Sequence, residues 1–253
     1  MTMDGAAPAL RLTGVTCRFG GVTAVASVSL EVPAGARHGI IGPNGAGKTT
    51  LFNAISGETA ATEGRVELFG RDVTRLGPAR RVGLGLGRTY QITRTFASLT
   101  VRENLTLAVH GLRRSKFAML RPWSRYHAEG ARAEALAERL QLERRLDDRA
   151  SELSHGEVRQ LEVALALALD PRVLLLDEPG AGLSPEERGN MGALLRDLPT
   201  DLTLVMIEHD MDLVRDVMRH IHVLDHGQVV TDGDTATVQA DPRVREIYLG
   251  ASA

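Results

Sequence analysis

The chain has 253 residues, of which 43% are hydrophobic, so it can form one large domain with a buried core. Its formal net charge of −2 argues against a nucleic-acid-binding surface, which usually makes a domain strongly basic. The single cysteine, Cys17, excludes an internal disulfide and fits a reducing compartment. Residues 1–10 have neither a basic start nor a long apolar run, so we expect no secretory signal. The longest uninterrupted apolar stretch, residues 163–169, is too short for a membrane span, which needs roughly 20 residues.

Strand patterns open the chain. Apolar residues alternate with polar ones between residues 9 and 32, which predicts antiparallel strands. Cys17 lies within this alternation, so we interpret it as a strand residue with no further role. Residues 64–69 predict another strand.

A nucleotide-phosphate loop follows the apolar residues 39–41 and precedes a helical pattern. Its glycines let the backbone curl until successive N–H groups point at phosphate oxygens, and the next helix adds its positive N-terminal end. We expect Lys48 to reach the β- and γ-phosphates of a nucleotide and the Thr49 hydroxyl to hold Mg²⁺. The strand–turn–helix context disfavours the alternative of an ordinary glycine-rich turn. The nucleotide-binding residues of this loop are Gly42, Pro43, Asn44, Gly45, Ala46, Gly47, Lys48, Thr49 and Thr50.

The middle of the chain, about residues 92–160, is predicted to be a helical insertion. Residues 131–142 have the apolar spacing of an amphipathic helix, and residues 157–169 and 185–198 also predict helices. Ser184 is the expected cap of the last helix, with Pro185 in its first turn. A basic cluster between residues 113 and 125 is interpreted as a solvated face, with contact to a membrane surface or partner as the alternative.

Two short apolar runs, residues 172–176 and 202–207, are typical of parallel strands buried on both faces. The first run leads into Asp177, which we expect to hold Mg²⁺ directly or through water, and Glu178, which we expect to act as general base on a water. A solvated strand end is the alternative. Residues 221–230 predict a hairpin. The predicted fold is α/β: a P-loop NTPase (RecA-like) parallel-sheet core, an N-terminal antiparallel β subdomain and a helical subdomain, forming a single domain over residues 8–250.

The segment Leu153-Ser154-His155-Gly156-Glu157 opens a helix and resembles the L-S-G-G-Q signature of the ATP-binding cassette (ABC) family. Ser154 and Gly156 are retained, and a hydroxyl and exposed N–H groups at a helix N-terminus bind an anion. The resemblance implies that these two residues contact ATP bound to the opposite subunit. His155 and Glu157 depart from the pattern. We expect the Glu157 carboxylate to point away from the phosphates or to pair with Arg159.

The ABC resemblance implies roles for three further residues. Gln91 matches the glutamine that senses Mg²⁺ and the attacking water, and His209 matches the switch histidine that contacts the γ-phosphate. Phe19 matches the aromatic residue that stacks on adenine, with core packing as the alternative. Residues 180–184 replace the family's usual loop at the dimer interface and lack its aspartate. The remaining histidines are predicted to have no metal-ligand spacing: His38, His110, His127, His155, His220, His222 and His226.

Several stretches look like the ATP-binding subunits of branched-chain (hydrophobic) amino-acid importers, among them residues 51–53, 87–91, 99–105, 181–185, 207–211, 241–243 and 248–250. Such systems use two different ATPase subunits, and residues 88–91 resemble the longer one. Cassettes for urea or other amides and for lipopolysaccharide export share much of this pattern and remain alternatives. A soluble ABC ATPase acting on DNA or ribosomes, and a degenerate cassette in a heterodimer, are less favoured.

The resemblance implies ATP and Mg²⁺ as cofactors and a peripheral position on the cytoplasmic face of the cell membrane. The implied partners are integral-membrane permease subunits, a second ATP-binding subunit and, indirectly, a periplasmic or extracellular solute-binding protein. No nucleic-acid partner is expected. Residues 92–105 are the predicted contact with the membrane subunit.

Overall fold

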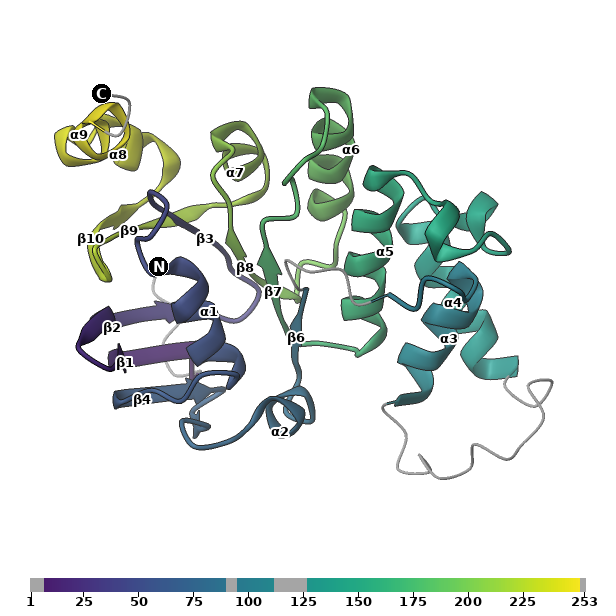
Figure 1. Ribbon diagram of the computed structural model, residues 1–253, viewed down its shortest axis with the longest axis horizontal. Helices are drawn as coiled ribbons and strands as arrows, with labels where there is room; N and C mark the ends of the chain where they lie inside the picture. The colour runs from purple at the N-terminus through teal and green to yellow at the C-terminus, as the bar shows by residue number, and fades with distance from the viewer. Residues whose placement is uncertain (1–6, 90–94, 112–126, 251–253) are drawn as a thin grey trace.

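The computed structural model describes residues 7–89, 95–111 and 127–250 (Figure 1). In chain order the elements are β1 (Leu10–Phe19), β2 (Val22–Val32), β3 (Arg37–Ile41), α1 (Lys48–Ser56), β4 (Glu63–Leu68), β5 (Arg71–Asp72), α2 (Pro78–Val82), β6 (Leu86–Arg88), α3 (Val101–Gly111), α4 (His127–Arg139), η2 (Glu143–Arg145), η3 (Ala150–Glu152), α5 (His155–Ala168), β7 (Val173–Asp177), α6 (Pro185–Arg196), β8 (Thr203–Ile207), α7 (Met211–Val217), β9 (His220–Asp225), β10 (Gln228–Gly233), α8 (Thr235–Ala240) and α9 (Pro242–Gly250).

The described strands form two sheets. The N-terminal sheet has the order β2-β1-β4-β5 and is antiparallel throughout. The second sheet has the order β10-β9-β3-β8-β7-β6, in which only β10 runs antiparallel to its neighbour. The predicted α/β fold with a parallel core and an N-terminal antiparallel part is therefore confirmed, as is the hairpin around Asp225.

The parallel sheet is buried on both faces because successive residues of its strands point to opposite sides. In β7, Leu174 and Leu176 join the core shared with the helices, whereas Val173 and Leu175 join the core shared with α1 and the antiparallel sheet. This explains why the β7 sequence is a continuous apolar run rather than an alternating one. The sheet therefore lies between the helical side and the antiparallel side of the molecule (Figure 1).

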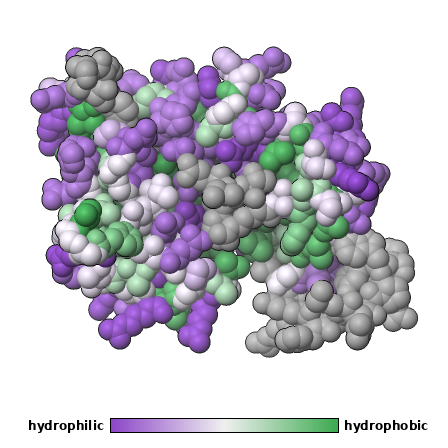
Figure 2. Space-filling model, in the orientation of Figure 1, coloured by the Kyte–Doolittle hydropathy of each residue, from purple (hydrophilic) through white to green (hydrophobic). Residues whose placement is uncertain are grey.

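The predicted helices are present with shifted ends. The amphipathic helix predicted over residues 131–142 is α4, which begins at His127 and ends at Arg139. The two later predictions correspond to α5 and α6, and Ser184 caps α6 by accepting a hydrogen bond from the Glu187 N–H, as expected. Among the described residues, no helix combines the length and apolar character needed to cross a bilayer. Figure 2 shows apolar side chains gathered on the α3–α5 side of the visible face.

Candidate nucleotide-binding site

The loop between β3 and α1 has the backbone shape that phosphate binding requires. Gly45 and Gly47 have φ values of 83° and 96°, in the left-handed region that favours glycine. A Cβ added at Gly42 would lie 2.0 Å from the Leu224 carbonyl oxygen, and one at Gly47 would lie 2.3 Å from that of Ala24. Gly47 is the N-cap of α1 and offers no side-chain cap, so the helix start is left to a ligand anion.

Lys48 lies inside this loop with only 7% of its surface exposed. Its Nζ donates hydrogen bonds to the carbonyl oxygens of Gly42 (2.7 Å) and Pro43 (2.9 Å). Burial lowers the pKa of Lys48, and the nearby carboxylates of Glu178 and Asp177 oppose that shift. The next residue, Thr49, is exposed at the mouth of the loop.

Asp177, at the end of β7, is 3% exposed and forms a buried ion pair with Arg88. Arg88 Nη2 lies 2.9 Å from Asp177 Oδ2, and Nη1 donates to Asn53 Oδ1 and Ser56 Oγ, both at 2.8 Å. The guanidinium thus connects β6, β7 and the helix after the phosphate loop. Sequence reasoning did not assign this role to Arg88, because only the pairing of β6 with β7 brings the two residues together.

The Glu208 carboxylate, which sequence reasoning missed, links the loops that follow β7 and β8 through hydrogen bonds. Glu208 is fully buried, and its two carboxylate oxygens accept hydrogen bonds from the Gly180 N–H (2.7 Å) and the His209 N–H (2.8 Å). Glu178 is half-buried with a φ of 49°, and its N–H donates to the Ile207 carbonyl oxygen at 3.0 Å. The His209 side chain is 62% exposed, so it is accessible to a ligand. The only sequence signal for Glu208 was a charged residue directly after an apolar strand.

The N-terminus of α5 is closed by a reciprocal cap. Ser154 Oγ accepts from the Glu157 N–H (3.3 Å), and Glu157 Oε2 accepts from the Ser154 N–H (2.8 Å). Glu157 Oε1 accepts from Arg145 Nε at 2.8 Å. The alternative that Glu157 pairs with Arg159 is therefore wrong: Arg159 instead pairs with Glu162, which lies on the next turn of its own helix.

The Glu157 carboxylate is held by hydrogen bonds to its neighbours and does not stand as an unpaired charge. Burial raises its pKa, but the hydrogen bonds from Ser154 and Arg145 outweigh that effect and lower it. His155, the other departure from the signature pattern, points at the loop after β7, where its Nε2 lies 3.2 Å from the Ala181 carbonyl oxygen. Both departures thus have local structural partners.

Comparison with known proteins agrees with this geometry. The family model described as ABC transporter matches residues 25–181, and the one described as branched-chain amino acid ATP-binding cassette transporter matches residues 228–253. The chain is 36% identical to the high-affinity branched-chain amino acid transport ATP-binding protein BraF of Pseudomonas aeruginosa, over 96% of this chain and 98% of that protein. The chain belongs to the ABC transporter family.

Solved structures of other ABC cassettes share this fold. An ATP-binding cassette of an ABC transporter in its ADP conformation superposes with a TM-score of 0.84 at 33% identity, covering 96% of this chain and 99% of that one. A dimeric cassette in a post-hydrolysis state, bound to ADP and Pi, superposes with a TM-score of 0.77 at 25% identity, covering 89% of this chain and 98% of that one. The chain is thus an ATPase cassette of the class that binds adenine nucleotides.

The ABC cassette has a donor set that fits Mg²⁺. A threonine hydroxyl from Thr49 and a carboxylate from Asp177 are hard oxygen ligands, which Mg²⁺ prefers together with water and substrate phosphates. The loop also fits a nucleotide phosphate, because no side chain caps the start of α1 at Gly47 and a helix N-terminus favours an anion. Gln91, the third residue expected at the metal, lies outside the described residues, as does the basic cluster at 113–125.

Phe19 lies at the tip of the β1–β2 hairpin, where it is 52% exposed beside Val22 at 67%. The core-packing alternative for Phe19 is therefore wrong, and its ring is accessible to a flat ligand. One prediction about histidines is also wrong: His38, His220 and His222 do come together, on adjacent strands that are distant in sequence.

Proposed function

We propose that this ABC cassette hydrolyses ATP to energise an importer of branched-chain or other hydrophobic amino acids. The observation that carries the substrate class is the match of residues 228–253 to the branched-chain amino-acid cassette family. This segment lies beyond the ABC match at residues 25–181, so it distinguishes branches of the family that share the catalytic motifs. The name of the relative BraF supports the same class.

The site residues take the following roles in this proposal. Lys48 and the loop N–H groups bind the β- and γ-phosphates, while Thr49, Asp177 and Gln91 hold Mg²⁺, which neutralises phosphate charge when bound. Glu178 takes a proton from the attacking water, and its left-handed backbone directs the residue out of the line of β7. His209 contacts the γ-phosphate from the end of β8, held there through the bond from its N–H to Glu208. The exposed ring of Phe19 stacks on the adenine.

Ser154 and Gly156 complete the site of a second copy or a second, different cassette. Within one chain, the start of α5 and the start of α1 lie on opposite sides of the parallel strands (Figure 1). They therefore serve a nucleotide held by another chain, and the dimeric cassette bound to ADP and Pi supports that arrangement. Closure of the dimer assembles the catalytic residues and hydrolysis reopens it.

The segment around Phe96 and α3 is the proposed contact with the permease. Asn104 organises it: its Oδ1 accepts from the Phe96 N–H at 2.8 Å, and its Nδ2 donates to the Phe96 carbonyl at 3.1 Å. Phe96 itself is 61% exposed and Leu107 is 36% exposed. An exposed aromatic ring on a turn held by these hydrogen bonds is suited to a pocket on a membrane subunit. We infer that the cassette, as a single domain over residues 8–250, meets the permease from the cytoplasmic face of the membrane.

The partners are tested by affinity purification of tagged Glu178→Gln protein from detergent-solubilised native membranes with ATP present. We expect mass spectrometry to identify two multi-span subunits and a second, different cassette. Recovery with ribosomal or DNA-bound proteins, or only from the soluble fraction, would overturn the transport assignment and leave the ATPase chemistry intact.

The substrate is tested by uptake in cells that lack the chromosomal copy of this gene. Cells carrying the unmutated protein should accumulate labelled leucine, isoleucine or valine, and cells carrying Lys48→Ala should not. Uptake of labelled urea or an amide instead would assign the cassette to the related amide importers. If cells carrying Lys48→Ala still take up both the amino acids and the amides but show altered lipopolysaccharide at the cell surface, the cassette would be assigned to export.

A further inference from the structure

Three histidines lie on one face of the parallel sheet, toward the end of strands β3 and β9 that is opposite the phosphate loop. His38 and His220 are paired positions on the adjacent parallel strands β3 and β9, and His222 follows two residues later on β9. Residues two apart in a strand point to the same face, so the strand pairing alone brings the three side chains together. His38 precedes Gly42 by four residues of extended strand, which places His38 ~13 Å from the start of the phosphate loop, and His222 lies opposite Ile40, nearer to it.

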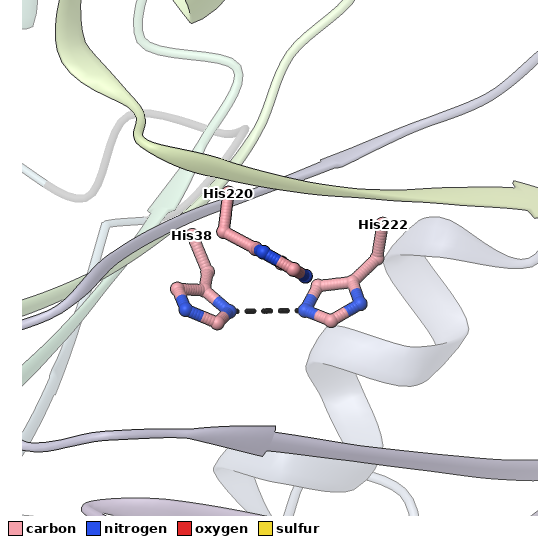
Figure 3. A group of neighbouring side chains, drawn as sticks. All are labelled: His38, His220 and His222. Carbon is pink, nitrogen blue, oxygen red and sulfur yellow. Dashed lines mark hydrogen bonds between the residues drawn. The ribbon is translucent and has the colours of Figure 1, made fainter. Parts of the chain in front are cut away.

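The imidazole nitrogens converge (Figure 3). His38 Nδ1 lies 3.0 Å from His222 Nε2, and one ligand nitrogen from each histidine lies within 4.8 Å of the others. His38 and His222 are 7% and 5% exposed, whereas His220 is partly exposed toward a pocket between the ends of β2 and β10. A metal ion at tetrahedral geometry holds its nitrogen ligands about 3.3 Å apart, for bonds of ~2.0–2.1 Å. The separations in the cluster, from 3.0 Å between His38 Nδ1 and His222 Nε2 up to 4.8 Å, bracket that spacing.

The charge state of the cluster suits coordination. Burial lowers the pKa of His38 to about 3 and that of His222 to about 4, and in both cases the neighbouring histidines add to the effect. The two imidazoles are therefore neutral at neutral pH and present lone pairs. His220 Nε2 lies 2.9 Å from Asp232 Oδ2 on β10, the kind of carboxylate contact that orients a metal-bound histidine.

We propose that His38, His220 and His222 form a binding site for a divalent transition-metal ion of the zinc class, with Asp232 as its orienting carboxylate. Three imidazoles are a known zinc donor set, and imidazole suits zinc, copper and nickel better than magnesium or calcium. On binding, whichever of His38 and His222 now donates the hydrogen bond between them moves its ring proton to its other nitrogen, and the ion takes the place of that bond. It joins β3 to β9 and, through Asp232, to β10, and so stabilises the edge of the sheet that carries the C-terminal segment 228–253.

The first experiment measures zinc binding to the full chain after removal of any histidine tag and without nucleotide. We expect one equivalent of Zn²⁺ by equilibrium dialysis and elemental analysis, and a visible absorption spectrum of nitrogen-coordinated Co²⁺ when cobalt replaces zinc. At a zinc concentration of 100 times the dissociation constant, the melting temperature should rise by about 5–10 °C. Less than one-tenth of an equivalent, with no change in melting temperature, would show that the cluster is only a hydrogen-bonded packing contact.

Variants assign the binding to these residues. His220→Gln changes the least buried of the three and should weaken zinc binding more than 100-fold, while Asp232→Asn should weaken it about 10–100-fold. His226→Gln is the matched control, because this histidine lies in the same hairpin with its side chain 95% exposed and outside the cluster. Circular dichroism and ATP binding show whether His220→Gln is folded. Should that variant not fold, Asp232→Asn with the cobalt spectrum decides instead. Unchanged zinc affinity in a folded His220→Gln protein would overturn the proposal.

Discussion

The ion pair between Arg88 and Asp177 gives the sharpest test of how the nucleotide site is held together. The two side chains are 6% and 2% exposed, with 2.9 Å between Nη2 and Oδ2. Arg88→Met removes the charge and leaves Asp177 buried without this counter-charge. Removing one partner of a buried pair costs about 3–5 kcal/mol, because the remaining charge stays desolvated. For a chain of this length that loss corresponds to a fall in melting temperature of about 6–20 °C.

The assay is urea unfolding followed by circular dichroism, in the absence of nucleotide. Arg102→Met is the matched control, since Arg102 pairs with Glu134 and Asp147 at the surface, where Asp147 is 85% exposed. Exposed pairs contribute at most about 1 kcal/mol, so this control should change stability by no more than that. Adding Asp177→Asn to Arg88→Met should recover part of the loss, because the buried charge is then gone. An Arg88→Met protein as stable as the Arg102→Met control would refute the reasoning.

Three further predictions concern the loop, the base and the signature. Gly47→Ala should destabilise the protein by about 1–3 kcal/mol and weaken ATP binding, because the added Cβ would lie 2.3 Å from the Ala24 carbonyl oxygen. Unfolding and nucleotide titration measure the two effects. Gly21→Ala is the control: its Cβ would meet nothing within 4 Å, so it should be neutral in both assays. Glu178→Gln should keep ATP affinity and cut phosphate release by roughly 10²–10⁴, and turnover near that of the unmutated protein would remove Glu178 from the base role. Glu157→Gln can still accept a hydrogen bond from the Ser154 N–H, so its free energy of unfolding should fall by less than about 1 kcal/mol. Glu157→Ala removes the cap, so its free energy of unfolding should fall by about 0.5–2 kcal/mol. Equal melting temperatures for the two variants would contradict the capping interpretation.

Local patterns in the sequence were enough for most of the fold and for the phosphate loop. The continuous apolar runs of β7 and β8 require burial on both faces, which only a covered parallel sheet provides. The loop glycines and Lys48 act within one turn of chain, so their spacing alone predicts their geometry. The cap at Ser154 and Glu157 is equally local, three residues apart.

The tertiary structure alone decided which distant side chains become partners. Arg88 meets Asp177 across 89 positions of sequence, and His38 meets His222 across 184, in each case because two parallel strands pair side by side. Strand order and register are set by how the whole chain packs, and no local periodicity encodes them. For that reason the sequence determined that this protein is an ABC cassette with a phosphate loop, and the packing of its sheet determined the Arg88 ion pair, the buried Glu208 and the histidine cluster.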